Sequence, residues 1–235
     1  MRVVILAGGK GSRISHFTQK IPKPMVTIGN IPMLTHIMDI FKFYGFDDFI
    51  IAVGFKGDVI KKYYKKSKKF SKIKIIDTGK ETMTGGRLLK LKHILKKEES
   101  FFLTYGDGVT NLNLKKLYKF HRRNKKLATV TAVRPPVRFG EVTVRRNNIV
   151  KKFDEKPHLN SGWINGGFFI LNKEILKYTK NYKTVFEREP LIKIAKLKQL
   201  IAYKHKGYWK CMDNMKDKEQ LEEIFKKKKT IWKIT

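Results

Sequence analysis

A glycine-rich stretch near the N-terminus brings together the first residue types whose spacing could do chemistry. Residues 6–13 read Leu-Ala-Gly-Gly-Lys-Gly-Ser-Arg and begin where a β-branched run ends, and that run predicts a strand over residues 2–7. Glycines at the end of a strand let backbone N–H groups approach phosphate oxygens closely. The stretch therefore indicates a phosphate-binding loop, although a tight turn after the strand would also use its glycines.

Two common phosphate-binding motifs do not fit this loop. A dinucleotide-binding G-x-G-x-x-G motif starting at Gly9 and Gly11 would require a third glycine where Ile14 stands, and no acidic residue follows near the position expected to bind a ribose. A P-loop motif would require serine or threonine directly after its lysine, but Lys10 is followed by Gly11. Both motifs are therefore excluded.

A lysine between two prolines follows the loop. The pattern Gly-Gly-Lys-Gly-Ser-Arg ends at Arg13, and Pro22-Lys23-Pro24 begins nine residues later. The prolines restrict the backbone around Lys23, which suits a cation that has to be aimed at a ligand, although a surface turn could have the same sequence. Together the two patterns resemble the signature G-G-x-G-[ST]-R…P-K-P of the sugar-1-phosphate nucleotidyltransferases.

Seven further segments narrow the resemblance to one family. In chain order they are residues 81–88 (ETMTGGRL), 104–108 (TYGDG), 128–133 (ATVTAV), 139–140 (FG), 155–157 (EKP), 162–169 (GWINGGFF) and 212–213 (MD). In this order and at this spacing they resemble the glucose-1-phosphate cytidylyltransferases, a family that makes CDP-glucose from CTP and glucose 1-phosphate. The resemblance covers nearly the whole chain.

The resemblance implies that a phosphate oxygen of glucose 1-phosphate attacks the α-phosphorus of CTP and that pyrophosphate leaves. Because the attacking phosphate is already an anion, such an enzyme needs no general base; it needs cations and a metal ion between two polyanions. The catalytic residues implied are Arg13, which would bind the triphosphate, and Lys23, which would lie between the attacking and leaving phosphates. The nucleotide-binding residues implied are Leu6, Ala7, Gly8, Gly9, Lys10, Gly11, Ser12, Arg13, Lys23, Thr82, Gly85, Gly86, Arg87, Gly106 and Asp107.

Two aspartates are implied to bind the metal ion, Mg²⁺. Asp107 follows a strand predicted over residues 101–104, and ligands of open α/β sheets collect at the carboxyl ends of strands. With Asp213 it would supply the carboxylate oxygens that Mg²⁺ prefers. Alternatively, Asp107 is a turn residue, and Asp213 caps the helix predicted over residues 216–228.

The sugar phosphate is implied to bind further along the chain. Lys156 resembles the family's lysine that holds the sugar phosphate, although it could also be a solvated surface lysine. Glu155 and Asn165 could exchange hydrogen bonds with glucose hydroxyls. Gly166 and Gly167 would allow the sugar ring close to the strand, although a glycine pair within a strand can also form a bulge.

The elements that must position these residues alternate along the first two thirds of the chain. Apolar runs predict strands over residues 2–7, 49–53, 73–76, 101–104, 128–133, 141–144, 149–153 and 167–171, and helical periodicity predicts helices over residues 33–44, 58–64, 87–95, 114–122, 185–196 and 216–228. Strands without clean alternation are expected to be buried on both faces of a parallel sheet. We therefore expect an α/β, Rossmann-like nucleotidyltransferase fold: a mixed, mostly parallel sheet flanked by helices, with a small irregular β-containing C-terminal part.

A single domain over residues 1–235 is expected, because no linker rich in proline, glycine or serine divides the chain. Within it, residues 1–134 would form the nucleotide-binding α/β part and residues 135–235 the sugar-phosphate-binding part. No apolar run approaches the length of about 18 residues that spans a membrane, and the single cysteine, Cys211, favours a reducing compartment. We therefore expect a cytoplasmic protein without membrane contacts.

Composition and charge limit the partners. The apolar fraction of 41% excludes a mostly disordered chain. Lys+Arg 53 against Asp+Glu 20 gives a net charge of +33, but 43 of these basic residues are lysines spread along the chain, whereas arginine is the residue suited to reading bases. We therefore expect no nucleic-acid partner, although a non-catalytic polyanion-binding protein on the same scaffold is an alternative.

The chain departs from the family pattern in two places. Only a short lysine-rich stretch lies between Tyr64 and Ile73, where the family has a longer insertion, and Asn214 follows Asp213 where threonine is usual. Because members of the family are oligomers, we expect a homo-oligomer. The main alternative for the activity is the same chemistry with another nucleotide, such as UTP or dTTP, or with another sugar phosphate.

Overall fold

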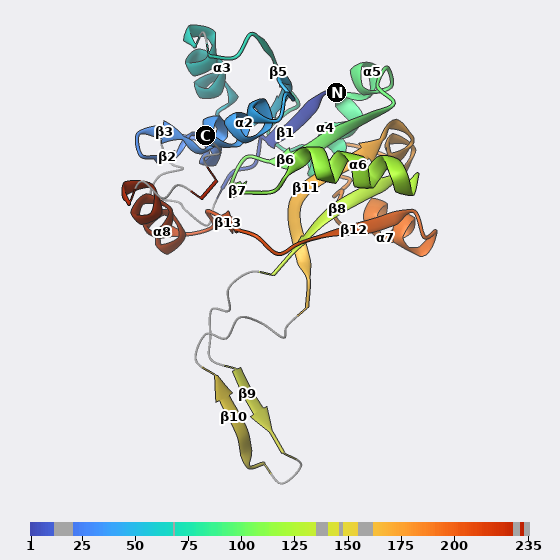
Figure 1. Ribbon diagram of the computed structural model, residues 1–235. Helices are drawn as coiled ribbons and strands as arrows, with labels where there is room; N and C mark the ends of the chain where they lie inside the picture. The colour runs from blue at the N-terminus through green and yellow to red at the C-terminus, as the bar shows by residue number, and fades with distance from the viewer. Residues whose placement is uncertain are drawn as a thin grey trace.

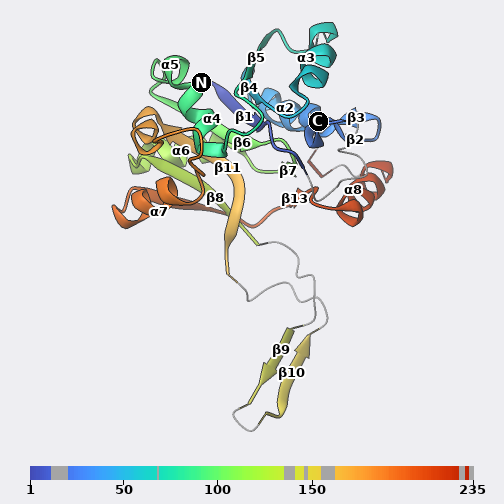
Figure 2. The ribbon, with the colours of Figure 1, turned by 180° about the vertical axis from the view of Figure 1, so that it is seen from behind.

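A seven-stranded sheet is the central element of the computed structural model, which describes residues 1–11, 21–67, 69–134, 141–145, 148–154, 162–227 and 231–232 (Figure 1 and Figure 2). Its strands, from edge to edge, are β12 (Leu200–His205), β8 (Ala128–Val133), β11 (Ile164–Asn172), β6 (Ser100–Tyr105), β1 (Val3–Ala7), β4 (Asp48–Val53) and β5 (Lys72–Asp77). Neighbouring strands are parallel except at β11, which runs antiparallel to both β6 and β8. The sheet is therefore mixed and mostly parallel.

Strand β1 shows why this sheet is buried on both faces. All five of its side chains are buried. Val3, Ile5 and Ala7 belong to one hydrophobic cluster, and Val4 and Leu6 belong to the other. Successive side chains of a strand point to opposite faces, so an uninterrupted apolar run is what a central strand between two cores requires.

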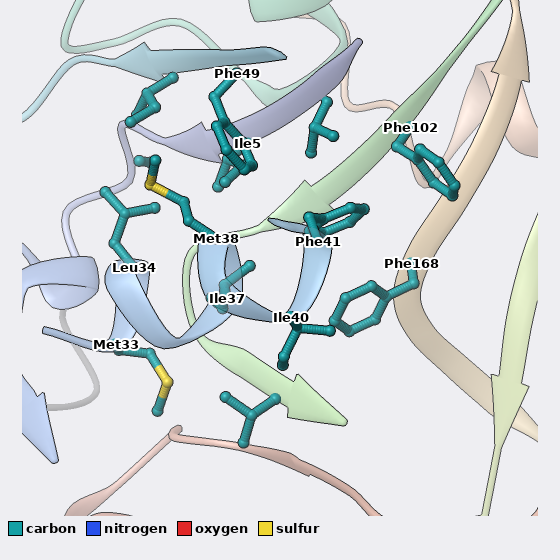
Figure 3. Close-up of a cluster of buried hydrophobic side chains, with 14 of the residues drawn as sticks. Ile5, Met33, Leu34, Ile37, Met38, Ile40, Phe41, Phe49, Phe102 and Phe168 are labelled. Atoms are coloured by element: carbon teal, nitrogen blue, oxygen red, sulfur yellow. The ribbon is translucent and has the colours of Figure 1, made fainter. Parts of the chain in front are cut away.

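Helices supply the other half of each core. In the first cluster, α2 (Met33–Phe43) packs on the sheet, and Phe41 meets Phe102 of β6 edge to face at 5.3 Å and stacks with Phe168 of β11 (Figure 3). The second cluster contains Leu88, Leu95 and Ile194. These side chains come from α4 (Thr84–Lys90), α5 (Lys92–Leu95) and α7 (Glu189–Lys196).

The remaining described elements are short or lie outside the main sheet. They are α3 (Gly57–Lys66), α6 (Leu114–Asn124), α8 (Met215–Lys226), the 3-10 helices η2 (Lys23–Met25) and η3 (Lys173–Tyr178), and three two-stranded pairs: β2 (Thr27–Ile28) with β3 (Ile31–Pro32), β7 (Gly108–Thr110) with β13 (Trp209–Cys211), and β9 (Glu141–Val144) with β10 (Val150–Asp154). The β9–β10 hairpin stands apart from the main sheet (Figure 1). None of the helices in the described part of the chain has the length and apolar character needed to cross a membrane.

The predicted fold class is confirmed, and the differences from the predicted elements are local. Strand β12 was not predicted: residues 200–203 form an apolar run of only four residues, and the strand lies at an edge of the sheet where side chains such as Ala202 and Lys204 are exposed. The helix predicted from residue 185 begins at Glu189, with Pro190 in its first turn, where proline is tolerated. The helix predicted over residues 87–95 begins earlier, at Thr84, and is divided into α4 and α5 at Leu91.

Candidate active site

Asp107 and Asp213, which are far apart in the sequence, meet through a small antiparallel pair. Asp107 follows β6, and the next residues form β7, which pairs with β13 in the register Gly108 to Cys211. The backbone N–H of Met212 also donates to the carbonyl of Asp107 at 2.9 Å. The pairing of β7 with β13 therefore places the second aspartate beside the carboxyl end of β6.

Lys23 joins both aspartates. It begins the short helix η2, and its Nζ lies 2.7 Å from Oδ2 of Asp107 and 2.9 Å from Oδ1 of Asp213. A Cβ on Gly106 would lie 2.6 Å from the ring of Pro24, so glycine at this position lets η2 pack close enough for the contact. The three residues that the sequence grouped as catalytic and metal-binding therefore converge on one point.

The charges of this group define what it can bind. Burial favours neutral Lys23, but Asp107 and Asp213 outweigh burial and raise the pKa of Lys23 above its ordinary value. The lysine therefore stays protonated near neutral pH. Two carboxylates contact this one ammonium, and carboxylate oxygens are ligands that a hard divalent cation prefers.

The donor set fits a hard divalent cation that takes its other ligands from substrate and water. The two carboxylates already share one cation, the ammonium of Lys23. Within the described residues, no group of three or more His, Cys, Asp and Glu side chains could hold a metal ion. Mg²⁺ commonly uses one or two carboxylates together with phosphate oxygens, so two aspartates are sufficient.

Cys211 is close to this centre but is unsuited to nucleophilic chemistry. Its Sγ lies 3.4 Å from Oδ2 of Asp213. Burial and the neighbouring aspartates, Asp213 first, raise the pKa of the Cys211 thiol to about 12. Because the thiolate is the reactive form, Cys211 stays an unreactive thiol at neutral pH.

The start of helix α8 holds the backbone of Asp213 in place. Asn214, and not Asp213, is the N-cap: its side chain accepts from the N–H of Asp217 at 2.9 Å. The Asp217 carboxylate in turn accepts from the N–H groups of Asp213 and Asn214. The alternative in which Asp213 caps the helix is therefore wrong. Asparagine serves well as an N-cap, so its replacement of the usual threonine preserves the cap.

Arg87 supports the glycine loop from the protein interior. Its guanidinium donates to the carbonyl oxygens of Gly8 at 2.9 Å, Gly79 at 3.0 Å and Val53 at 3.1 Å, and to the hydroxyl of Thr78. A Cβ on Gly8 would lie 2.2 Å from the guanidinium. Burial lowers the pKa of Arg87. These contacts join the ends of β1 and β4, while a contact between Arg87 and the nucleotide stays a prediction.

Two glycines predicted to bind the nucleotide, Gly85 and Gly86, lie close to other protein atoms. Cβ atoms on Gly85 and Gly86 would lie 2.9 Å from the carbonyl oxygen of Thr184 and 2.3 Å from that of Tyr182. At Gly9, in contrast, a Cβ would have no heavy atom of the described residues within 4 Å. In the described part of the chain, nothing fills the space beside Gly9, where a phosphate contact is predicted.

Other predicted nucleotide-binding residues lie around the same loop. Leu6 and Ala7 end strand β1 and are buried, and Thr82 is buried beside Gly79. Lys10 forms an ion pair with Glu81 at 2.9 Å. The loop after β1 and the segment before α4 are thus connected at the surface as well as through Arg87.

The predicted sugar side lies at a bulge in strand β11. The register between β11 and β8 shifts between Asn165 and Phe169, and Gly167 has a φ of +79°, a conformation that favours glycine. The side chain of Asn165 accepts from the N–H of Gly167 at 2.8 Å, and Trp209 donates to the carbonyl of Gly166 at 2.7 Å. The glycine pair therefore forms the bulge, while its contact with sugar stays a prediction.

Tyr105 and Glu187 were not singled out from the sequence. A Cβ on Gly167 would lie 2.7 Å from the ring of Tyr105, and the hydroxyl of Tyr105 donates to Glu187. Tyr105 lies within the segment TYGDG, directly before Gly106, so its place in that segment was an available signal. Glu187 precedes α7 and belongs to none of the segments of the resemblance.

Four predicted site residues lie outside the described residues. They are Ser12 and Arg13 of the glycine loop and Glu155 and Lys156 of the sugar-phosphate side.

Comparison with known proteins extends across the whole chain. Residues 2–228 match the nucleotidyl transferase family. Glucose-1-phosphate cytidylyltransferase of Salmonella typhimurium is 41% identical over 256 residues, covering 99% of each chain. Probable glucose-1-phosphate cytidylyltransferase of Bacillus subtilis is 38% identical over 256 residues, covering 100% of each chain. The solved structure of HddC from Yersinia pseudotuberculosis superimposes with a TM-score of 0.75 at 27% identity, covering 95% of this chain and 99% of that chain.

Proposed function

Because the chain belongs to the nucleotidyl transferase family and, within it, to the glucose-1-phosphate cytidylyltransferases, we propose that it transfers the cytidylyl group of CTP to glucose 1-phosphate. The products are CDP-glucose and pyrophosphate. The observation that carries this proposal is the convergence of Lys23, Asp107 and Asp213 at the carboxyl ends of the strands. Joining two polyanions requires positive charge between them, which Lys23 and a divalent cation on the two aspartates would supply.

The reaction requires one bond to form and one to break. A phosphate oxygen of glucose 1-phosphate forms a bond to the α-phosphorus of CTP, and the bond from this phosphorus to the α,β-bridging oxygen breaks in line. Pyrophosphate leaves with the bond's electron pair. Because the attacking phosphate oxygen is already anionic, no proton has to be taken from the nucleophile. Backbone N–H groups around Gly9 would bind the triphosphate, with Arg13 as a second cation. Asn165 and Glu155 would bind sugar hydroxyls, and Lys156 the sugar phosphate.

Lys23 supplies the positive charge at the reacting phosphates. Its pKa is raised by its two aspartates, so it enters the reaction protonated. The restriction of its backbone by Pro22 and Pro24 aims the ammonium without a large loss of entropy on binding. Charge builds up at phosphorus during the transfer, so this lysine contributes most in the transition state.

We further propose that Asp107 and Asp213 hold Mg²⁺. When bound, the ion would neutralise part of the charge of the triphosphate. The residues fit it because their oxygens converge on one cation and are ligands that a hard divalent cation prefers. Asn214 and Asp217 orient Asp213 for this contact through the start of α8.

We expect a homo-oligomer in the cytoplasm, with CTP and glucose 1-phosphate as its small-molecule partners. The 256-residue alignments are longer than the 235 residues of this chain, so its relatives contain residues without a counterpart here. Sedimentation velocity would determine whether the chain assembles. A monomer at micromolar concentration would contradict the expectation of an oligomer without affecting the proposed reaction.

The test of the activity is release of pyrophosphate from glucose 1-phosphate, Mg²⁺ and each of CTP, UTP, dTTP, ATP and GTP in separate reactions. We expect release with CTP. Release with a different nucleotide alone would keep the nucleotidyl transfer but overturn the proposed specificity. Absence of release with every nucleotide and with other sugar phosphates would favour the non-catalytic polyanion-binding protein.

A further inference from the structure

Residues 182–187, between η3 and α7, pack directly against the segment 82–87, where nucleotide contacts are predicted. The N–H of Met83 donates to the carbonyl of Tyr182 at 2.9 Å. The N–H groups of Gly85 and Gly86 donate to the carbonyl of Thr184 at 2.9 and 3.1 Å. The position of segment 82–87 is therefore set by a part of the chain that the proposed function does not use.

Glu187 is the last residue of segment 182–187, and its two carboxylate oxygens contact two different elements. Its Oε2 accepts from the hydroxyl of Thr84 at 2.6 Å, and its Oε1 accepts from the hydroxyl of Tyr105. The same Thr84 hydroxyl accepts from the N–H of Phe186 at 2.9 Å. Thr84 is therefore held in one orientation, with its proton toward the carboxylate.

Tyr105 connects Glu187 to the sugar side. Its ring occupies the space that a side chain on Gly167 would need, and the N–H of Gly167 donates to Oδ1 of Asn165 at 2.8 Å. The ring of Tyr105 therefore packs against the bulge while its hydroxyl donates to Glu187.

We propose that Glu187 is a positioning residue of the reaction: through Thr84 and Tyr105 its carboxylate fixes the nucleotide-binding segment relative to the bulge that faces the sugar. The inference rests on the proposed function, because it assigns these two sides to the two substrates. Hydrogen bonds to an ionised acceptor are stronger than neutral ones, so a carboxylate holds two hydroxyls more firmly than an amide does. In-line attack depends on the alignment of both substrates, and a misplacement of about 1 Å can cost about 100-fold.

The main variant is Glu187→Gln, which keeps the size of the side chain and removes its charge. We expect kcat/KM to fall about 10- to 100-fold, with a higher KM for both CTP and glucose 1-phosphate. The matched control is Glu189→Gln, two residues away, where the carboxylate is exposed and pairs with Lys180. The control should keep the wild-type kcat/KM.

A double-mutant cycle separates coupling through Glu187 from two local effects. Thr84→Val and Tyr105→Phe each remove one donor to the carboxylate. If Glu187 joins them, the two changes are non-additive, and the double variant loses no more kcat/KM than Glu187→Gln does. Additive losses, with each variant raising the KM of only one substrate, would overturn the proposal.

A measurement that does not depend on turnover tests the coupling through Glu187 separately from the proposed function. In amide hydrogen exchange, Tyr105→Phe should increase exchange over residues 84–87, and Thr84→Val should increase it over residues 164–167. Exchange confined to the neighbourhood of each change would overturn the coupling, even if no nucleotide is turned over. If wild-type protein released no pyrophosphate but the distant exchange changed, the proposed function would fail while the structural coupling held. Wild-type activity with unchanged Glu187→Gln kinetics would refute the positioning role alone.

Discussion

The candidate site contains an inner ion-paired group around Lys23 and an outer ion pair of Lys10, whose contacts have similar lengths but different surroundings. In the inner group, Lys23 contacts Asp107 at 2.7 Å and Asp213 at 2.9 Å, and its side chain is 11% exposed. In the outer pair, Lys10 contacts Glu81 at 2.9 Å, with side chains 55% and 70% exposed. Water and salt screen the outer charges, and two long side chains lose entropy to keep the contact. Because the distances are similar, we expect burial, and not distance, to make the inner group contribute more to activity than the outer pair.

The inner group should give the largest effect of any single change. Lys23→Ala removes the cation at the reacting phosphates, so we expect kcat to fall about 100- to 1,000-fold, with a smaller change in KM. Steady-state pyrophosphate release at saturating substrates checks this. A variant that keeps the wild-type kcat would remove Lys23 from the mechanism and with it the contrast between the two pairs.

The two carboxylates of the inner group should be separately essential. Asp107→Asn and Asp213→Asn each leave one carboxylate facing Lys23 and remove one of the two proposed ligands of the divalent ion, so we expect activity to fall about 100-fold together with weaker binding of that ion. Direct titration with Mn²⁺, followed by its paramagnetic signal, measures binding without turnover. Weakened Mn²⁺ binding in only one variant would mean that the metal site does not use both aspartates.

Arg87 is intermediate between the two pairs, because its buried cation binds neutral oxygens. Arg87→Met would leave the carbonyl oxygens of Gly8, Val53 and Gly79 without this donor. We expect the free energy of unfolding to fall by about 1–3 kcal/mol and the KM for CTP to rise, because the glycine loop loses its internal support.

Urea unfolding and nucleotide titration of Arg87→Met measure the two effects separately. Lys90→Met is a suitable control, since Lys90 is an exposed lysine at the end of the same helix. Stability equal to wild type in Arg87→Met would show that the loop does not depend on these contacts.

The outer pair should give the smallest effect. Lys10 lowers the pKa of Glu81 through its hydrogen bond and charge, so any contribution of the pair is present at neutral pH and is lost as the pH falls through that lowered pKa. We expect Glu81→Gln to change kcat/KM by less than about twofold and to leave the melting temperature unchanged. A loss comparable to that of Lys23→Ala would show that exposure is a poor guide to importance at this site.

The parts of the fold that could be predicted are those with a strong local signal. Strand β1 was evident because a central strand between two cores must be apolar at every position, and α2 because its apolar residues recur on one face. Strand β12 was missed although residues 200–203 are apolar, because so short an apolar run does not distinguish an edge strand from other structure. The short strands β7 and β13 depend on pairing with each other across the chain, which no local pattern reveals.

The candidate site shows the same division. Lys23, Asp107 and Asp213 could be grouped in advance, because each lies in a segment of the resemblance, which implied its role. Glu187 could not, because its importance arises from two hydroxyls that are distant in the sequence, on Thr84 and Tyr105. Gly85 was predicted to bind the nucleotide; the structure shows the backbone of Thr184 close to it, and the nucleotide contact stays a prediction.

The sequence by itself indicated the kind of chemistry: the glycine loop predicted phosphate binding, and the resemblance to the glucose-1-phosphate cytidylyltransferases implied the roles of Lys23, Asp107 and Asp213. It also determined the layered α/β fold, because the periodicity of apolar residues follows from the geometry of strands and helices. Only the tertiary structure decided that Arg87 supports Gly8 from the interior, that Asn214 caps α8, and that Lys23 lies between both aspartates. These contacts join residues distant in the chain, and they depend on burial and distance, which exist only once the chain is folded.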